Sequence, residues 1–556
     1  MDVAHAVGKA LATAGIDHVF GVVGSGNFHV TNALVAAGAR FVAAAHEGGA
    51  ASMADGYARV SGRAAALSVH QGPGLTNALT GITEAAKSQT PLVVLAPEAT
   101  NPRSNFFIDL AGIASGIGAA FLRVRPEQVA QDVAQAYGMA VRGGGQTVVL
   151  GLPLDVQTMP VDDTMPVPVE RPWLPPRGEV GPLVDVLAAA RRPVFIAGRG
   201  ALRQVPLVTP PPRPPHTARL ALTRLADRCG ALLAVSAVAR GLFVGDPWFL
   251  DVSGGFATPL AAELIAQADL VVAWGSTLNM WTTRHGRLIS PGTRVAQVDL
   301  DAAALGRNRR VDIGVVGELA VAAQDCADEL DRRGAHPAGW RTPELSARIA
   351  TEGRWRDVSY VDTSEADRID PRTLSIGLDD LLPVARTVVV DSGNFMGYPS
   401  MFLSVPDAAG FCFTQAYQSI GLGLASALGA AVARPDRLTV AALGDGGFLM
   451  SVAELTTAVR LALPLLVIVY NDAAYGAEVH HFGPHGHPLN TVRFPDTDLA
   501  SIARGFGCAA TTVRAPADLA AVTEWLAGGR DRPMVVDAKV VSTQASWWLA
   551  EAFRGH

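Results

Sequence analysis

The feature that most constrains this fold is a pair of apolar strands joined by a single helix towards the carboxyl end of the sequence. Two strands are predicted here: Leu438 to Leu443, which is apolar except for Thr439, and Leu465 to Tyr470, which is a continuous apolar run typical of strands buried on both faces of a parallel sheet. Gly444-Asp445-Gly446-Gly447 follows the first run, and Asn471-Asp472 follows the second. Because the carboxyl ends of adjacent parallel strands meet at one edge of a sheet, we expect Asp445 and Asp472 to lie side by side.

The segments around this pair continue the pattern. A helix is predicted after Gly447 as far as about Leu461, with Ser451-x-x-Glu454 as a capping box. A strand at Thr387 to Val390 leads into Asp391-Ser392-Gly393-Asn394. A helix rich in glycine and alanine is predicted from about Ser419 to Val432, and its small residues allow another backbone to pack closely.

A chain of 556 residues is too long for one hydrophobic core. Strands and helices also alternate in two earlier segments, which are separated by a proline-rich linker from about Pro153 to Pro176. We therefore predict an α/β fold of three doubly wound parallel-sheet domains, at residues 1–160, 178–335 and 365–556. The expected strands of the first two domains are His18 to Val23, Phe41 to Ala45, Ala64 to Val69, Pro91 to Ala96, Thr147 to Leu150, Val194 to Ala197, Leu270 to Trp274 and Val295 to Leu300.

Composition excludes several classes of function. Hydrophobic residues make up 49% and charged residues 17%, so the chain is globular, and a net charge of −6 gives no reason to expect nucleic acid or an anionic membrane as a partner. The four cysteines form no C-x-x-C pair and are expected to be reduced core thiols of a cytoplasmic protein. No signal peptide or membrane span is indicated. The run Pro210 to Pro215 is predicted to be a surface loop, with a segment recognised by a proline-binding partner as the alternative.

Asp445 and Asp472 suit a hard divalent cation. Mg²⁺ prefers oxygen ligands and takes the rest of its octahedron from phosphates and water. The glycines beside Asp445 allow backbone N–H groups to approach a phosphate closely. A Gly-Asp-Gly sequence alone is also compatible with an ordinary turn, but the second acidic loop one strand later favours a metal site.

These residues carry a specific resemblance. Gly444-Asp445-Gly446 followed by Asn471-Asp472, with 27 positions from Asp445 to Asp472, resembles the GDG…NN fingerprint of thiamine-diphosphate-dependent enzymes. His46-Glu47-Gly48-Gly49-Ala50 and the residues to Arg59 resemble the family pattern HEQGAAHMADGYAR, and the stretch from His70 to Asn77 resembles its SGPGATN region. The chain is thus similar to the acetolactate synthase and benzoylformate decarboxylase branch, although Asp472 replaces the usual Asn.

The resemblance implies an architecture. The first domain corresponds to the pyrimidine-binding (PYR) domain, the second to the central Rossmann-like domain and the third to the diphosphate-binding (PP) domain. It also implies a homodimer or homotetramer whose active sites lie between the PYR domain of one subunit and the PP domain of another. The implied cofactors are thiamine diphosphate and Mg²⁺. FAD, which accompanies acetolactate synthases, is not expected, because the central domain departs from their pattern.

The resemblance also implies residue roles. Glu47 is predicted to hydrogen-bond N1′ of the cofactor's aminopyrimidine and favour its imino form. Ile420 is predicted to support the bent cofactor, while Gly393 and Asn394 match the family loop only in part. Metal ligands would be Asp445, Asp472 and the carbonyl of Ala474. The full set of predicted cofactor-binding residues is Glu47, Asn77, Gly393, Asn394, Ser419, Ile420, Gly444, Asp445, Gly446, Gly447, Asp472, Ala474, Tyr475 and Gly476.

The substrate pocket is predicted from three further residues. Ser25 and His70 stand where benzoylformate decarboxylase-like members carry Ser and His, and a neutral imidazole could relay protons near neutral pH. Glu478 stands six positions after Asp472, as a catalytic Glu does in pyruvate decarboxylases. A structural histidine and a surface glutamate are the alternatives. Four nearby histidines are predicted at the pocket mouth, with a zinc site as the alternative: His480, His481, His485 and His487.

We therefore expect an enzyme that forms or cleaves the carbon–carbon bond next to a carbonyl in a small 2-oxo acid. A 2-hydroxyacyl-CoA or oxalyl-CoA lyase is the alternative, although few basic residues follow Ser542. A catalytically silent cofactor-binding scaffold is a third possibility, opposed by the retention of Glu47 and Asp445. An NAD enzyme is ranked last, since no G-x-G-x-x-G motif follows a first strand.

Overall fold

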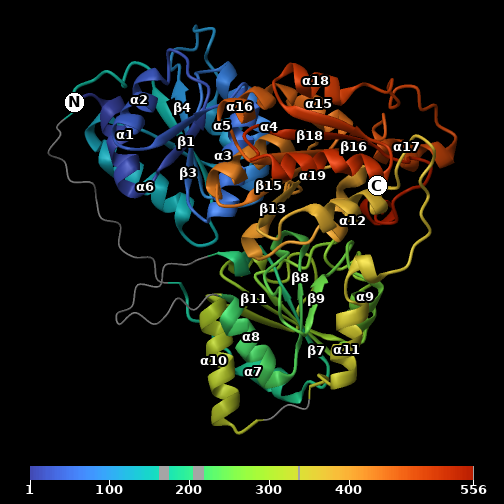
Figure 1. Ribbon diagram of the computed structural model, residues 1–556. Helices are drawn as coiled ribbons and strands as arrows, with labels where there is room; N and C mark the ends of the chain where they lie inside the picture. Colours follow the sequence, from blue (N-terminus) through green and yellow to red (C-terminus); the bar gives the residue numbers. More distant parts are fainter. Residues whose placement is uncertain (162–174, 204–217, 336–338, 555–556) are drawn as a thin grey trace.

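The computed structural model describes residues 1–161, 175–203, 218–335 and 339–554, and it contains three six-stranded sheets whose paired strands are all parallel. The strand orders are β2-β1-β3-β4-β6-β5, β12-β11-β10-β7-β8-β9 and β14-β13-β15-β16-β18-β17. Figure 1 shows the first and third units side by side, with the central unit beneath them. The predicted α/β class with three doubly wound parallel sheets is confirmed.

The first unit contains strands β1 (His18–Gly21), β2 (Arg40–Ala43), β3 (Ala65–Ser68), β4 (Leu92–Glu98), β5 (Ala120–Arg123) and β6 (Thr147–Pro153). Its helices are α1 (Val3–Ala14), α2 (Phe28–Ala36), α3 (Glu47–Ser61), α4 (Pro73–Lys87), α5 (Leu110–Gly116) and α6 (Val129–Val141). The second unit contains β7 (Pro193–Ala197), β8 (Leu232–Val235), β9 (Phe249–Val252), β10 (Leu270–Trp274), β11 (Arg294–Asp299) and β12 (Ile313–Val316), with helices α7 (Gly181–Ala189), α8 (Ala218–Cys229), α9 (Pro259–Ala266), α10 (Leu319–Arg332) and α11 (Pro343–Glu352).

The third unit contains β13 (Arg386–Val390), β14 (Phe411–Phe413), β15 (Leu438–Gly444), β16 (Leu465–Asn471), β17 (Ala509–Val513) and β18 (Met534–Lys539). Its helices are α12 (Pro371–Leu381), α13 (Gly397–Phe402), α14 (Gly423–Ala433), α15 (Asp445–Ser451), α16 (Leu455–Arg460), α17 (Gly476–Phe482), α18 (Leu499–Gly505), α19 (Ala520–Ala527) and α20 (Leu549–Ala552). The two apolar runs pair as predicted, with Gly444 opposite Tyr470.

Two helix predictions were wrong in detail. The helix predicted from Ser419 begins at Gly423, because the turn before it is held by the Asp391 carboxylate and contains Gly421 at a φ of 87°. The helix predicted up to Leu461 is interrupted by a 3₁₀ turn, η8 (Val452–Glu454), between α15 and α16. The capping box is absent, since the Ser451 hydroxyl donates to the Gly447 carbonyl and the Glu454 carboxylate bonds to the first unit.

The first and third units meet where α3 crosses α14. A β-carbon on Gly56 would lie 2.2 Å from the carbonyl oxygen of Ser426, and one on Gly429 would lie 1.9 Å from that of Met53. Both distances are shorter than any real contact, so the two backbones touch directly and glycine is required on both helices. The predicted close approach to the small-residue helix is confirmed, and its partner is α3.

Three further predictions concern a membrane span, the cysteines and the proline-rich segments. The described residues include no helix long and apolar enough to cross a membrane. All four cysteines are buried and free of disulfides. The run Pro210 to Pro215 and most of the predicted linker lie outside the described residues.

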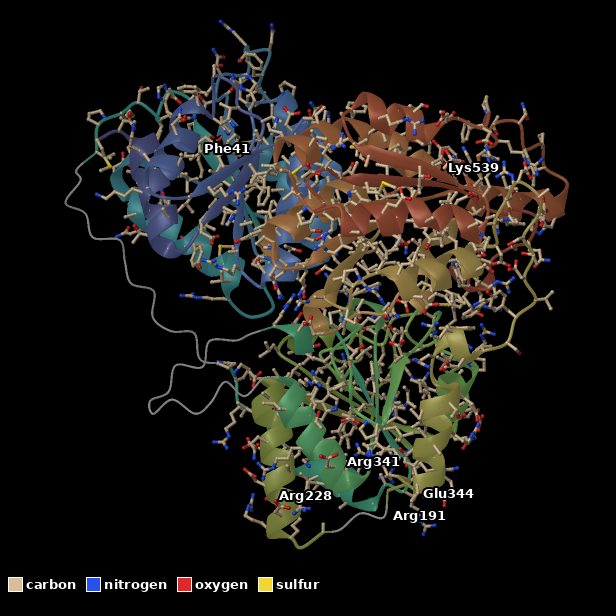
Figure 2. All side chains as sticks on the ribbon, viewed as in Figure 1. Phe41, Arg191, Arg228, Arg341, Glu344 and Lys539 are labelled. Atoms are coloured by element: carbon tan, nitrogen blue, oxygen red, sulfur yellow. The ribbon has the colours of Figure 1, made fainter. Side chains whose placement is uncertain are left out.

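In Figure 2, Lys539 marks the end of β18, where its buried ammonium group donates to Asp496 (2.5 Å) and to the Thr497 carbonyl (2.8 Å).

The crossing predicts an unusual response to alanine. In the middle of an ordinary helix, Gly→Ala stabilises by up to about 1 kcal/mol. Gly429→Ala should instead lower the free energy of unfolding by about 1–3 kcal/mol, because the added methyl group overpacks a backbone contact. Chemical denaturation of the purified protein measures the change. The control is Gly181→Ala at the start of α7, where no atom lies within 4 Å of an added β-carbon; equal effects of the two substitutions would contradict the prediction.

Candidate active site

The third sheet forms a cradle at its carboxyl edge. Asp445 follows β15 directly and Asp472 follows the adjacent strand β16, so the predicted juxtaposition holds. Tight packing shapes the rest of the cradle. A β-carbon on Gly476 would lie 2.3 Å from Oδ2 of Asp472, and one on Gly446 would lie 2.6 Å from the Tyr475 ring. These glycines let the loop after β16 fold against the loop after β15.

The two carboxylates lack a positive partner. Burial raises the pKa of Asp445, and burial together with the charge of Asp445 raises the pKa of Asp472. Backbone N–H groups, that of Ala474 among them, donate to both side chains and partly offset the effect. Within the described residues neither carboxylate forms an ion pair with Lys, Arg or His. Two facing carboxylates of this kind fit a divalent cation bound through oxygen.

The loop that carries Asp472 is fixed by hydrogen bonds of the Asn471 side chain. The buried Asn471 side chain donates to Asp537 (2.8 Å), and its oxygen accepts from the Ala473 N–H (3.1 Å). Ala473 has a φ of 55°, a left-handed conformation that few residues other than glycine adopt. Asn471 therefore fixes a strained turn that aims Asp472 towards Asp445. This supporting role was not predicted from the sequence, although Asn471 lies within the Asn471-Asp472 motif.

A second missed residue is Asp391, which follows β13. Its fully buried carboxylate accepts from the N–H groups of Gly421 (2.8 Å) and Leu422 (3.2 Å). A β-carbon on Gly447 would lie 2.5 Å from its Oδ2. Asp391 thus ties together three loops of the cradle and places Ile420 on the cavity wall. Its position at a strand end could have revealed it in the sequence.

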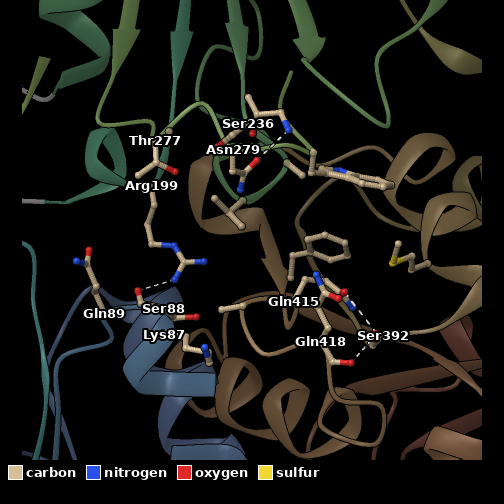
Figure 3. A pocket seen from close by; sticks show the side chains of 18 of the residues that line it. Lys87, Ser88, Gln89, Arg199, Ser236, Thr277, Asn279, Ser392, Gln415 and Gln418 are labelled. Carbon is tan, nitrogen blue, oxygen red and sulfur yellow. Dashed lines mark hydrogen bonds between the residues drawn. The ribbon is translucent and has the colours of Figure 1, made fainter. Parts of the chain in front are cut away.

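The cradle opens into a cavity of about 1360 Å³ that reaches the central unit. In Figure 3 the central unit contributes Arg199, Thr277 and Asn279 at the top of the view of this cavity. The Arg199 guanidinium donates to the Ser88 carbonyl (2.5 Å). Three buried polar atoms in the described part of the wall have no hydrogen-bond partner: Oδ1 of Asn394, Nε2 of Gln415 and Nε1 of Trp281. Unpaired buried polar groups are costly, so these atoms fit a polar ligand. The expectation that the protein binds no FAD stays a prediction, since no observation here tests it.

Most predicted cofactor-binding residues of the third unit line this cavity. They are Gly393, Asn394, Ile420, Gly444, Asp445, Gly446, Gly447, Asp472, Ala474, Tyr475 and Gly476, together with the candidate catalytic Glu478. Ser419 does not line it, because its hydroxyl turns to the Ile420 carbonyl (3.1 Å).

The remaining candidates lie at the carboxyl edge of the first sheet. Glu47 is the first residue of α3, and Asn77 donates to its Oε2 (3.1 Å). His70 packs against the loop that carries Ser25, since a β-carbon on Gly24 would lie 2.5 Å from Nδ1 of His70. None of these four residues lines the cavity, whose lining from the first unit comes instead from other residues, such as Lys87, Ser88 and Gln89. Within one chain, the candidate residues of the first unit therefore lie apart from the cavity that holds those of the third unit.

One wall of the cavity was not predicted from any sequence motif. Leu549, Ala552 and Phe553, on and beside α20, line it. The indole N–H of Trp548 donates to the Asn394 carbonyl (3.2 Å), and the Phe553 ring stacks on His481 at 4.0 Å. The histidines from His480 to His487 do not line the cavity. Among the described residues no group of three or more His, Cys, Asp or Glu side chains is arranged to hold a metal.

Comparison with known proteins identifies the class. Three family models match: "Thiamine pyrophosphate enzyme, N-terminal TPP binding domain" over residues 1–113, the central domain over 180–326 and the C-terminal TPP binding domain over 391–538. The three parallel sheets, one in each unit, agree with these matches. The chain belongs to the thiamine pyrophosphate (thiamine diphosphate) enzyme family.

Individual relatives cover nearly the whole chain. "Probable 2-ketoarginine decarboxylase AruI" of Pseudomonas aeruginosa is 30% identical over 92% of this chain and 89% of its own length. "Sulfoacetaldehyde acetyltransferase" of Alcaligenes xylosoxydans xylosoxydans is 28% identical over 84% of this chain and 80% of its own. "Acetolactate synthase isozyme 2 large subunit" of Escherichia coli is 27% identical over 86% and 84%. An X-ray structure of a protein from Mycobacterium smegmatis shares the fold, with a TM-score of 0.78 at 22% identity over 97% of this chain and 99% of that one.

The carboxylate pair predicts a pH-dependent response to metal. A carboxyl whose pKa is raised on folding stabilises the protein below its unfolded pKa and loses this contribution as pH rises through the folded pKa. Burial raises the pKa of Asp445 to about 6, and burial with the charge of Asp445 raises that of Asp472 to about 8. The metal-free protein should therefore lose stability from both carboxyls as pH rises from about 4 to about 8, while Mg²⁺ binding, which requires deprotonated ligands, becomes tighter. Thermal unfolding with and without Mg²⁺ and thiamine diphosphate should show a larger stabilisation at the higher pH.

Asp472→Asn is the matched variant, because it keeps the oxygen and removes one charge. It should raise the stability of the metal-free protein at the higher pH and flatten the pH dependence of the response to metal. An unchanged pH dependence in this variant would show that Asp472 does not share the cation with Asp445.

Proposed function

We propose that this protein uses thiamine diphosphate and Mg²⁺ to form or cleave the carbon–carbon bond next to the carbonyl of a small 2-oxo acid. The observation that carries the proposal is the pair Asp445 and Asp472 at the ends of adjacent strands, in a cavity whose buried Asn394 oxygen lacks a partner. When bound, thiamine diphosphate supplies a nucleophilic carbon and an electron sink for this bond change. The names of the relatives, a decarboxylase, a synthase and an acetyltransferase, agree with such chemistry.

Asp445, Asp472 and the carbonyl of Ala474 would hold Mg²⁺, and the N–H groups of Gly446 and Gly447 would face the diphosphate. Glu47 would bind the aminopyrimidine nitrogen N1′ and exchange a proton with it. The Asn77 amide, 3.1 Å from the Glu47 carboxylate, orients that side chain. Such orientation is needed because a hydrogen bond to the ring works only when its direction is fixed.

Substrate would lie between the two half-sites, which are the candidate residues of the first unit and those of the third. Glu478 reaches the cavity from α17 and would move a proton at the reacting carbon. His70 and Ser25 would face the same substrate from the other half-site. The α20 wall, with Leu549 and Phe553, would exclude water from this side and make the pocket apolar.

The separation of the half-sites supports a dimer or tetramer. Glu47 and the cavity of the same chain do not meet, so each active site would take Glu47 from one subunit and Asp445 from another. Isologous pairing of two copies then gives two equivalent sites.

Turnover tests the chemistry. The protein is incubated with Mg²⁺, thiamine diphosphate and each of pyruvate, 2-oxobutyrate, benzoylformate, 2-ketoarginine and sulfoacetaldehyde, and CO₂ and products are measured. We expect turnover of at least one 2-oxo acid and a loss of at least about 100-fold in Glu47→Ala, because proton transfer and orientation both fail. Cofactor binding without turnover of any 2-oxo acid would favour an acyl-CoA substrate, and no cofactor binding would refute the proposal.

Mixed dimers test the shared site. Glu47→Ala and Asp445→Ala chains carrying different tags are co-expressed, and the mixed species is purified. Each variant alone should be inactive, but a mixed dimer contains one site with an intact Glu47 and an intact Asp445. Its activity should be roughly half that of the wild-type dimer, since one of two equivalent sites is restored. An inactive mixed dimer would show that both residues act within one chain.

A further inference from the structure

The segment that leads to Glu47 is held by the other cofactor-binding unit of the same chain. It runs from the end of β2 at Ala43 to the start of α3. The Ala45 N–H lies 3.2 and 3.1 Å from the two carboxylate oxygens of Glu454, and the His46 N–H lies 3.1 Å from one of them. The Arg460 guanidinium donates to the Ala43 carbonyl. Both ends of this segment are therefore fixed from the third unit.

The contact between Glu454 and the segment before Glu47 is buried and closely packed. Glu454 is only 2% exposed, and a buried carboxylate is stable only when donors surround it. Thr457 supplies a further donor, with its hydroxyl 2.8 Å from Oε2. A β-carbon on Gly49 would lie 2.0 Å from Oε1, so glycine in the first turn of α3 leaves the room that the carboxylate fills. Charge-assisted hydrogen bonds to backbone N–H groups are stronger than neutral ones.

The position of Glu454 connects two sites. It ends the turn η8, which continues α15, and α15 begins at Asp445 nine residues earlier. In the proposed dimer, Asp445 of this chain serves one active site, while Glu47 of this chain serves the other. Glu454 is thus in direct contact with the support of Glu47 and is one short helix away from the metal-binding residue of the neighbouring site.

We propose that Glu454 is a positioning residue that fixes Glu47 through the Ala45 and His46 backbone. It acts on the Glu47 of its own chain and not on the cradle to which it is joined in sequence. The inference rests on the proposed function. A purely structural role, in which Glu454 only docks the first unit on the third, is the alternative that the experiment addresses.

The first experiment compares Glu454→Gln with Glu84→Gln. Glu84 makes an analogous contact in the opposite sense, accepting from the Ala416 and Tyr417 N–H groups of the third unit at 3.1 and 2.6 Å. Both variants weaken the interface between the units, but only Glu454→Gln touches the segment before Glu47. We expect kcat to fall about 10–100-fold in Glu454→Gln with substrate KM nearly unchanged, because misplacing a catalytic group by about 1 Å costs rate rather than binding.

Two readouts separate positioning from docking. Hydrogen exchange of the metal-free and cofactor-free protein should quicken at Ala45 and His46 in Glu454→Gln but not in Glu84→Gln. The near-ultraviolet circular dichroism of bound cofactor, which reports the state of the aminopyrimidine, should change in Glu454→Gln only. If both variants lose activity in proportion to their loss of folded protein, and the two readouts do not differ, the proposal is overturned. Should Glu454→Gln not fold, Glu454→Asp retracts the charge by one methylene and takes its place.

Mixed dimers decide which site Glu454 serves. Glu454→Gln is added either to the Asp445→Ala chain, which supplies the working Glu47, or to the Glu47→Ala chain, which supplies the working Asp445. Activity should fall in the first mixed dimer and persist in the second. The reverse result would place the effect at the cradle and overturn the proposal. Failure of the proposed function is distinguishable, because the wild type would then lack Glu47-dependent turnover while the exchange experiment would still report on the contact.

Discussion

The backbone contact between α3 and α14 is the constraint on which the rest of the structure depends. Gly56 and Gly429 allow the helices to touch without intervening side chains, so the distance between them cannot vary with a rotamer. Glu47 starts α3, and α14 follows the turn that Asp391 holds beside the cradle. One rigid crossing thereby sets the two half-sites of a chain at a fixed separation. In the proposed assembly of identical chains, this separation would also fix how far apart the active sites lie.

Around this crossing, charge is distributed in two different ways. At the interface, Glu84 and Glu454 bind backbone N–H groups of the opposite unit, so each buried carboxylate has its donors within the chain. In the cradle, Asp445 and Asp472 face each other and have no cation among the described residues. The first arrangement is complete without a ligand and holds the fold. The second becomes favourable only when positive charge arrives, as expected of a binding site.

The sequence predicts what depends on local pattern and on topology. Buried parallel strands are visible as apolar runs, and parallel pairing alone places Asp445 beside Asp472. Helix limits were less accurate where a contact with a distant segment is made, as between Asp391 and the turn before Gly423 and between Glu454 and the His46 backbone. The α20 wall could not be predicted, since Trp548 and Phe553 belong to no motif and contact residues far away in sequence. The motifs also could not show that Glu47 and Asp445 of one chain remain apart.

The bond between Ala45 and Glu454 spans 409 positions, which has a consequence for biosynthesis. Domains generally fold in order as they leave the ribosome, so the first sheet can form while the third has not yet been translated. During this interval the α3 face around Gly56 has no helix against it, and the amides before Glu47 are hydrogen-bonded to water. The nascent first domain can thus be folded while the segment before Glu47 still lacks its contact with Glu454. Under the proposed function, the catalytic carboxylate would acquire its final position only when a much later part of the chain docks against it.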